Sequence, residues 1–111
     1  MRFPDRRAVR RALTRGRRMF VSLGRVVISP PASGSGCVLF VVPAAVSKRS
    51  SERNRIRRRL EAWAERVGRS GRLPAANIVI FVSPAAAGLS TKALWQLAEE
   101  SFPAITPRVR R

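Results

Sequence analysis

The sequence contains no histidine and no tyrosine, and Cys37 is its single cysteine. Without histidine, the chain has no imidazole for general acid–base catalysis, for a Ser–His–Asp triad or for a His-liganded zinc site. One cysteine allows no internal disulfide and no cysteine-rich metal cage, so we expect Cys37 to be a small buried apolar residue. We therefore expect neither catalytic residues nor metal ligands in the protein itself.

Acidic residues are scarce as well. The chain has 6 Asp and Glu against 23 Lys and Arg, which gives a formal net charge of +17 and favours a polyanionic partner. All the cations except Lys48 and Lys92 are arginines, whose planar guanidinium binds phosphate through paired donors and stacks on nucleobases. Metal-ion hydrolysis by a protein normally needs a carboxylate cluster. Here the acids are scattered over terminal and helical surface positions: Asp5, Glu52, Glu61, Glu65, Glu99 and Glu100.

Long apolar runs are absent too. No block reaches the ~18 residues that predict a transmembrane helix, so no membrane partner is expected. Residues 1–18 are rich in arginine and poor in acid, as in a mitochondrial presequence, but they fit an RNA-facing helix equally well. We expect a cytoplasmic protein with one domain over residues 1–103 and a basic, disordered tail over residues 104–111.

Turn and capping residues divide the chain into predicted helices and strands. Asp5 and Gly16 are typical signals for a helix start and end, Ser90 is a typical N-cap, and Pro103 is expected to terminate the last helix. The predicted elements are a helix over 6–15, strands over 19–21, 26–28 and 37–42, a helix over 51–67, a strand over 78–82 and a helix over 90–102. This order is typical of an α+β fold, a two-layer sandwich of helices on a small mixed sheet.

The most informative segment is 48–60, where cations crowd around the start of the predicted 51–67 helix. At about 100° per residue, one face of this helix is apolar and is expected to be buried. It comprises Ile56, Leu60, Trp63 and Val67. The arginines lie on the other faces: Arg53 and Arg57 on one flank, Arg55, Arg59 and Arg66 on the other, and Arg58 pointing outward with Asn54. Glu61 is one turn from Arg57, where the two can pair.

This clustering is unfavourable for the helix alone, because the cations repel one another and oppose the macrodipole at the helix N-terminus. Beside phosphates it becomes favourable through release of counterions. Asn54 adds a donor and an acceptor suited to a base edge or a 2′-hydroxyl. The alternative is a solvated basic face. The rings of Trp63 and Trp95 are candidate base platforms, but their positions on or beside apolar stripes favour core packing.

The segment VSKRSSERNRIRRRL, from Val46 to Leu60, resembles the signature of the bacterial ribonuclease P protein subunit, in which a strand and a basic turn lead into a helix opening with Arg-Asn-Arg. The order of predicted elements from Asp5 to Phe102 is also similar to that of the family. The resemblance implies a ribosomal protein S5 domain 2-like fold. It implies an accessory subunit of an endoribonuclease whose RNA, with Mg²⁺ at its active site, removes the 5′ leader of precursor tRNA. No protein partner is predicted.

The resemblance also implies roles for particular residues. The RNase P catalytic RNA is expected to contact Lys48, Arg49, Arg53, Asn54, Arg55, Arg57, Arg58 and Arg59. The leader of precursor tRNA is expected in a cleft between the first helix and the sheet, lined by Val9, Leu13 and Phe20. Phosphate contacts beside this cleft are expected from Arg10, Arg11, Arg15, Arg17 and Arg18.

The chain departs from the family pattern at two places. Ala44-Ala45 replaces a pair of lysines, and Val9 and Leu13 replace the aromatic residues that commonly face the leader. Stacking, worth about 1–3 kcal/mol per base, is therefore unavailable from the first helix, and Phe20 is the nearest substitute.

Two other classes of protein fit the charge. A non-enzymatic RNA-binding protein of the ribosome or its assembly would explain charge and size, but gives no reason for the Arg-Asn-Arg helix in this strand–helix–strand order. A basic architectural protein that binds DNA would be revealed by competition with duplex DNA.

Overall fold

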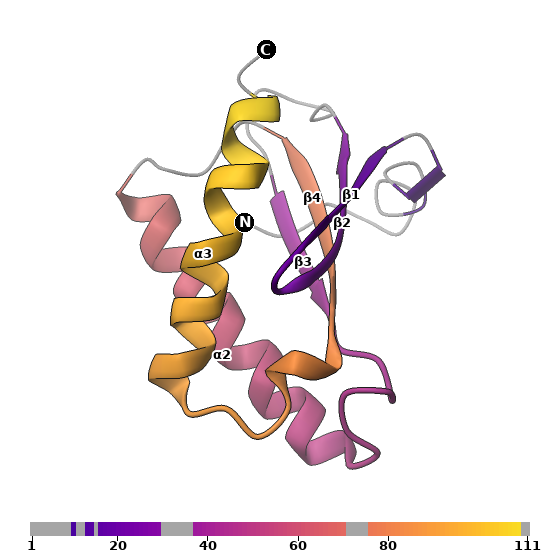
Figure 1. Cartoon of the computed structure of the whole chain (residues 1–111), viewed down its shortest axis with the longest axis vertical. Helices are drawn as coiled ribbons and strands as arrows, with labels where there is room; N and C mark the ends of the chain where they lie inside the picture. Colours follow the sequence, from indigo (N-terminus) through magenta and orange to yellow (C-terminus); the bar gives the residue numbers. More distant parts are fainter. Residues whose placement is uncertain (1–9, 11–12, 15, 30–36, 71–75, 110–111) are drawn as a thin grey trace.

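The computed structural model describes residues 10, 13–14, 16–29, 37–70 and 76–109, with only the backbone of residues 37 and 103–109. The predicted burial of Cys37 therefore lies outside the described side chains. In chain order, the elements are β1 (Arg17–Val21), β2 (Gly24–Ser29), β3 (Cys37–Val41), α2 (Ser50–Arg69), β4 (Asn77–Val82), the short 3₁₀ helix η1 (Pro84–Ala86) and α3 (Thr91–Val109) (Figure 1). Before β1, Arg10, Leu13 and Thr14 are helical, as predicted; the ends of this helix lie outside the described residues.

The strands form one mixed sheet in the order β1-β2-β4-β3. β2 pairs antiparallel with both β1 and β4, whereas β3 and β4 are parallel. α2 connects the parallel pair, which is the crossover expected for two apolar strands on either side of a long helix. α2 and α3 lie together on one face of the sheet (Figure 1), so the predicted α+β fold with a helical layer on a small mixed sheet is confirmed.

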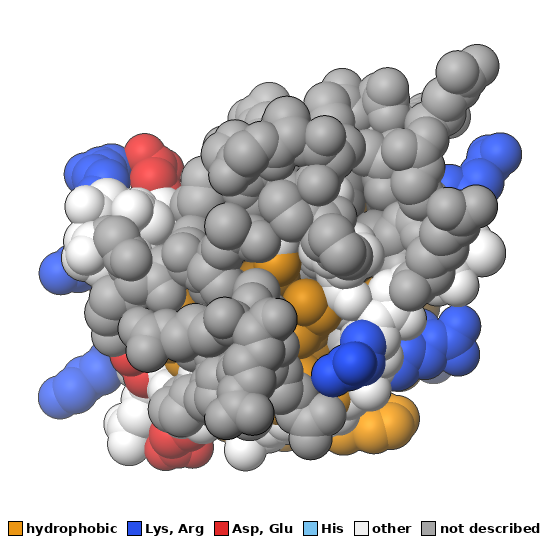
Figure 2. Space-filling view, turned by 90° about the horizontal axis from the view of Figure 1, so that it is seen from above, with side chains coloured by type: hydrophobic (Ala, Val, Ile, Leu, Met, Phe, Trp, Pro, Cys, Tyr) orange, Lys and Arg blue, Asp and Glu red, His pale blue; other side chains and the backbone are white. Residues whose placement is uncertain are grey.

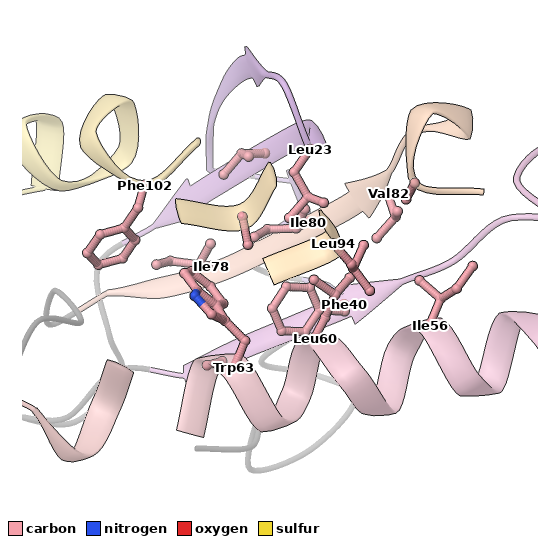
Figure 3. Packing of buried hydrophobic residues seen from close by; sticks show 14 of the residues in the cluster. Leu23, Phe40, Ile56, Leu60, Trp63, Ile78, Ile80, Val82, Leu94 and Phe102 are labelled. Carbon is pink, nitrogen blue, oxygen red and sulfur yellow. The ribbon is translucent and has the colours of Figure 1, made fainter. Parts of the chain in front are cut away.

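The face of the sheet beneath these helices holds the main core. Alternation along the strands directs Val26, Phe40 and Ile80 to this face, and all of them are buried. The helices cover them with large side chains (Figure 3). The rings of Trp63 from α2 and Phe102 from α3 meet edge to face, with 5.8 Å between centroids. This packing fixes which side of α2 faces the sheet and which side faces solvent.

The opposite face of the sheet, which α2 and α3 do not cover, is called the open face below. Val27 and Val79 are buried there. Partly buried side chains pack against them: Leu13, Leu39, Val41 and Phe81. Because Leu13 belongs to the helical segment before β1, that segment contacts the open face rather than the main core.

The last helix is longer than the sequence suggested. Pro103 was expected to end it after Phe102, but α3 continues to Val109, so residues 104–109 extend the helix instead of forming a disordered tail. A proline removes one helical hydrogen bond, yet its fixed φ near −65° is itself helical and the following residues can continue the turn. Although α3 has 19 residues, no helix among those described is long and apolar enough to span a membrane.

The β1–β2 hairpin is fixed by a close backbone approach at Gly24. This residue has a φ of +153°, and a Cβ built on it would lie 2.1 Å from the carbonyl oxygen of Phe81. The neighbouring Leu23 is buried; its N–H donates to the Ser101 hydroxyl of α3 at 2.9 Å, and its carbonyl accepts from the Ser83 N–H at 2.8 Å. Glycine is therefore required where β2 meets β4, and the hairpin is anchored to both layers.

Candidate nucleic-acid interface

The predicted buried stripe of α2 is confirmed. Ile56, Leu60, Trp63 and Val67 are all buried against the sheet and α3, together with Ala64, which the sequence reading had not included. Their burial directs the arginines of the first turns away from the core. The helix therefore presents a basic surface that makes no contribution to the core, as its sequence predicted.

The eight predicted contacts for the catalytic RNA divide into two classes by exposure. Those with exposed side chains are Lys48, Arg49, Arg55 and Arg58. Those with half-buried side chains are Arg53, Asn54, Arg57 and Arg59. Among the residues described, the exposed class makes no side-chain hydrogen bond or ion pair within the protein, whereas every member of the half-buried class is bonded to another group.

Ser47 organises the turn that leads into α2. Its hydroxyl donates to Glu52 Oε2 at 3.1 Å and accepts from the Arg49 N–H at 3.2 Å, while its carbonyl accepts from Arg53 Nη1 at 2.9 Å. Arg49 is the N-cap of α2 and offers no side-chain cap. These bonds tie the first turn of the helix to the preceding loop, so the exposed Lys48 and Arg49 stand on an ordered turn. The sequence reading missed Ser47, although a Ser five residues before a Glu near a helix start was a usable signal.

Arg57 and Arg59 are oriented by neighbours on the helices. Arg57 pairs with Glu61 at 2.9 Å, as its spacing predicted, and donates a second, short hydrogen bond to the Asn54 side-chain oxygen. Arg59 donates to the Leu89 carbonyl at 3.5 Å, across the gap to the start of α3. With its oxygen accepting from Arg57, Asn54 can offer its amide N–H groups to RNA.

Most of the positive charge is not neutralised within the protein. Among the residues that the structure describes, acidic partners are paired with Arg57 and with Arg69, which contacts Glu65 at 2.8 Å. Figure 2 shows the consequence on one face: the Asp and Glu side chains drawn in colour lie on the left, whereas the right carries Lys and Arg alone. A surface of this kind attracts phosphates and releases their counterions on contact. The described residues contain no group of His, Cys, Asp and Glu able to hold a metal ion.

Both tryptophans are engaged inside the protein. Trp63 is 5% exposed, and its indole N–H donates to Glu99 Oε2 at 3.0 Å. Trp95 is half-buried; its N–H donates to the Arg59 carbonyl at 2.9 Å, and the Arg66 guanidinium lies 5.2 Å from its ring centre. The preference for core packing over base stacking is confirmed for Trp63, and Trp95 joins α3 to α2.

The residues predicted for the leader cleft are only partly brought together. Phe20 is 82% exposed on β1, and Leu13 is half-buried against the open face. Val9 lies outside the described residues. Of the predicted phosphate contacts, the side chains of Arg10, Arg17 and Arg18 are exposed, and Arg11 and Arg15 lie outside the description.

Arg25 is a surface residue that the sequence reading missed. It is exposed on β2, directly opposite Phe20 in the β1–β2 register and opposite Phe81 in the β2–β4 register. Its guanidinium carbon lies 4.4 Å from the centre of the Phe81 ring. Alternation with the buried Val27 would have assigned it to the same face, but the strand pairing that brings it to Phe20 and Phe81 is not readable from sequence.

Comparison with known proteins decides the family. The ribonuclease P family model matches residues 1–105 of the chain. The chain belongs to the ribonuclease P protein family. This ribonuclease P protein thus takes part in the 5′ maturation of tRNA and has an RNA partner in the holoenzyme. No curated protein sequence matches it.

Solved ribonuclease P proteins share the fold over nearly the whole chain. The Staphylococcus aureus protein has a TM-score of 0.79 and 13% identity, covering 94% of each chain. A Staphylococcus aureus mutant with defective mRNA degradation activity has a TM-score of 0.80 and 14% identity, covering 94% of this chain and 86% of that one. The Thermotoga maritima protein has a TM-score of 0.75 and 14% identity, covering 98% and 97%. At such identities the similarity establishes the fold, and the basic face of α2 must be judged on its own geometry.

Proposed function

We propose that this ribonuclease P protein holds the catalytic RNA with the basic face of α2 and the 5′ leader of precursor tRNA on the open face of the sheet. The observation that carries the first part is the exposed set around the helix start. Lys48, Arg49, Arg55 and Arg58 are exposed and make no side-chain bond within the described protein. Held on an ordered turn and helix, they lose little freedom when they contact phosphates.

We infer that hydrolysis of the phosphodiester is carried out by the RNA, with Mg²⁺ at the RNA active site. The carboxylates that the structure describes on α2 serve other purposes: Glu52 accepts from Ser47, Glu61 pairs with Arg57, and Glu65 pairs with Arg69. Carboxylates used in this way support a structural role rather than metal binding. The protein then acts by positioning RNA, in the cytoplasm where bacterial precursor tRNA is made.

Reconstitution tests this proposal. The full-length protein is mixed with ribonuclease P RNA and precursor tRNA at a magnesium concentration too low for the RNA alone, and 5′ cleavage is measured. We expect the protein to stimulate cleavage at the mature 5′ end, because its cations offset repulsion between the two RNAs. A protein that binds the RNA without stimulating cleavage would contradict the proposal.

A variant pair locates the effect. Arg55→Ala with Arg58→Ala removes exposed cations of the basic face, whereas Lys92→Ala removes an exposed cation at the start of α3. The double variant should need more protein to reach the same stimulation, and the Lys92 variant should match the wild type. Equal behaviour of the two variants would mean that the stimulation depends on overall charge and not on the face of α2.

A further inference from the structure

A row of side chains crosses the open face of the sheet at one rank of the strand register. Phe20 of β1 is paired with Arg25 of β2, Arg25 with Phe81 of β4, and Phe81 with Val41 of β3. Neighbouring strands lie about 4.8 Å apart, so the side chains of such a rank are in reach of one another. The rank is therefore a continuous strip of two aromatic rings with a guanidinium between them.

The two ends of this strip differ in exposure. Phe20 is 82% exposed, the one large apolar side chain so exposed among the residues described, while Phe81 is half-buried in the open-face cluster. Arg25 covers the Phe81 ring with its guanidinium at 4.4 Å and is itself exposed. A guanidinium stacked on a ring by one face leaves its other planar face available for a second stacking partner.

The backbone beneath the strip is held in place. Gly24, next to Arg25, lies against the Phe81 carbonyl where no side chain would fit. Leu23 is bonded to Ser101 of α3 and to Ser83 beyond β4. The strip is thus presented on a fixed hairpin, and a ligand that stacks on it would not first have to order the backbone.

The surroundings of the strip are cationic. Arg18 is exposed on β1 at the next position on the same face, since it is paired with Val27. Neither β1 nor β2 contains an acidic residue. An exposed aromatic ring beside exposed guanidinium groups matches a polyanion with free base faces, which is single-stranded RNA; in a duplex the base faces are stacked and inaccessible.

We propose that Phe20 and the Arg25–Phe81 pair form a stacking platform for unpaired bases of the precursor-tRNA leader, with Arg25 as a specificity-determining residue. This inference rests on the proposed function of the open face. One base would stack on the Phe20 ring and a neighbouring base on the outer face of the Arg25 guanidinium, while Arg18 contacts the backbone phosphates. The platform supplies from the sheet the stacking that aliphatic Val9 and Leu13 do not supply.

Substitutions at the strip separate stacking from charge. In the holoenzyme, Phe20→Ala and Phe20→Leu should each weaken binding of leader-bearing precursor at least about fivefold and leave mature tRNA unchanged. Arg25→Lys keeps the charge but loses the planar face, so it should weaken binding nearly as much as Arg25→Ala. Lys92→Ala is the charge control on the other side of the molecule. Unchanged precursor binding by the Phe20 variants would overturn the platform, and full affinity of Arg25→Lys would overturn stacking by Arg25.

A coupling experiment assigns the contact to a base. Precursors with one abasic leader position at a time are bound to wild-type and Phe20→Ala holoenzyme. At one position the abasic site should cost the wild type severalfold in affinity and cost the variant nothing, because the partner ring is already absent. An equal loss in both proteins at every leader position would overturn the proposal.

A third measurement separates this inference from the proposed function. The free full-length protein is titrated into a single-stranded oligoribonucleotide that carries 2-aminopurine, whose fluorescence changes when the base stacks. The change should be lost in Phe20→Ala and kept in Lys92→Ala. If the wild type gives this signal but never stimulates cleavage with ribonuclease P RNA, the platform stands and the proposed function fails. If it stimulates cleavage but the signal does not depend on Phe20, the proposed function stands and the platform fails.

Discussion

The basic face of α2 and the open face of the sheet are both cationic, but they are built differently. On α2, Arg53 and Arg57 are bonded within the protein and surround exposed neighbours such as Arg58, so the surface is a fixed field of charge. On the sheet, Phe20 and Arg25 add planar groups to a smaller number of cations. A field of charge holds phosphates whatever the sequence or fold of the RNA, whereas planar groups require unpaired bases.

This difference assigns the structured RNA to α2 and the single-stranded leader to the sheet, and it predicts different responses to salt. Binding through phosphates weakens steeply as salt rises, since each contact releases counterions. Stacking has no such dependence. Experiments that damage one face should therefore leave the other face working.

The largest effect is expected from Gly24→Ala. The new Cβ would clash with the Phe81 carbonyl, so the free energy of unfolding should fall by about 3 kcal/mol, measured by denaturant titration. Gly88→Ala is the matched control, because Gly88 also has positive φ, +72°, but a Cβ there would meet no atom within 4 Å; about 1 kcal/mol is expected. Folded Gly24→Ala protein should lose leader binding and keep its affinity for the catalytic RNA. Equal destabilisation by the two alanines would contradict the proposed close approach.

The second effect concerns the charge of α2. Arg55→Ala with Arg58→Ala should lower affinity for the catalytic RNA about 100-fold at ~50 mM salt and converge on the wild type near ~1 M, since the log–log salt slope falls by about 0.7–0.9 per lost contact. Arg53→Ala with Arg57→Ala should flatten the slope less, because those guanidinium groups already have protein partners. Binding that is unchanged across the salt titration would rule out α2 as the RNA surface.

A smaller effect is expected at the turn before α2. Ser47→Ala removes the hydroxyl that links Glu52 to the Arg49 N–H, and should cost about 1 kcal/mol of stability, as loss of a helix-start hydrogen bond does. Affinity for the catalytic RNA should fall severalfold while leader binding stays constant, as measured by filter binding. Ser70→Ala, at the other end of the helix, should cost stability without a loss of RNA affinity.

The sequence predicted the architecture well because its apolar pattern is strong. The buried stripe of α2 follows from the spacing of Ile56, Leu60 and Trp63, and its pairing of Arg57 with Glu61 follows from helical geometry. The helix end was wrong because proline was treated as a terminator, although Pro103 continues α3.

The site was less predictable from sequence than the fold. Every predicted RNA contact in 48–59 is on the surface side of α2, but exposure divides that set into free and bonded groups, which depends on neighbours such as Ser47 and Leu89. Arg25 escaped notice because its meaning comes from strands that are far apart in the chain, β1 and β4. Local periodicity carries no information on such pairing.

The smallest effect provides the finest test of the charge field on α2. Glu61→Gln removes the acidic partner of Arg57, which should cost about 0.3–0.5 kcal/mol of stability, as for other exposed i, i+4 pairs. It should also strengthen binding of the catalytic RNA two- to threefold at low salt, because one more guanidinium becomes free for phosphate. Glu65→Gln releases Arg69 at the far end of the same helix and is the matched control, with the same small loss of stability. If both variants strengthen binding equally, the gain reflects net charge alone; a gain confined to Glu61→Gln places the catalytic RNA along the first turns of α2.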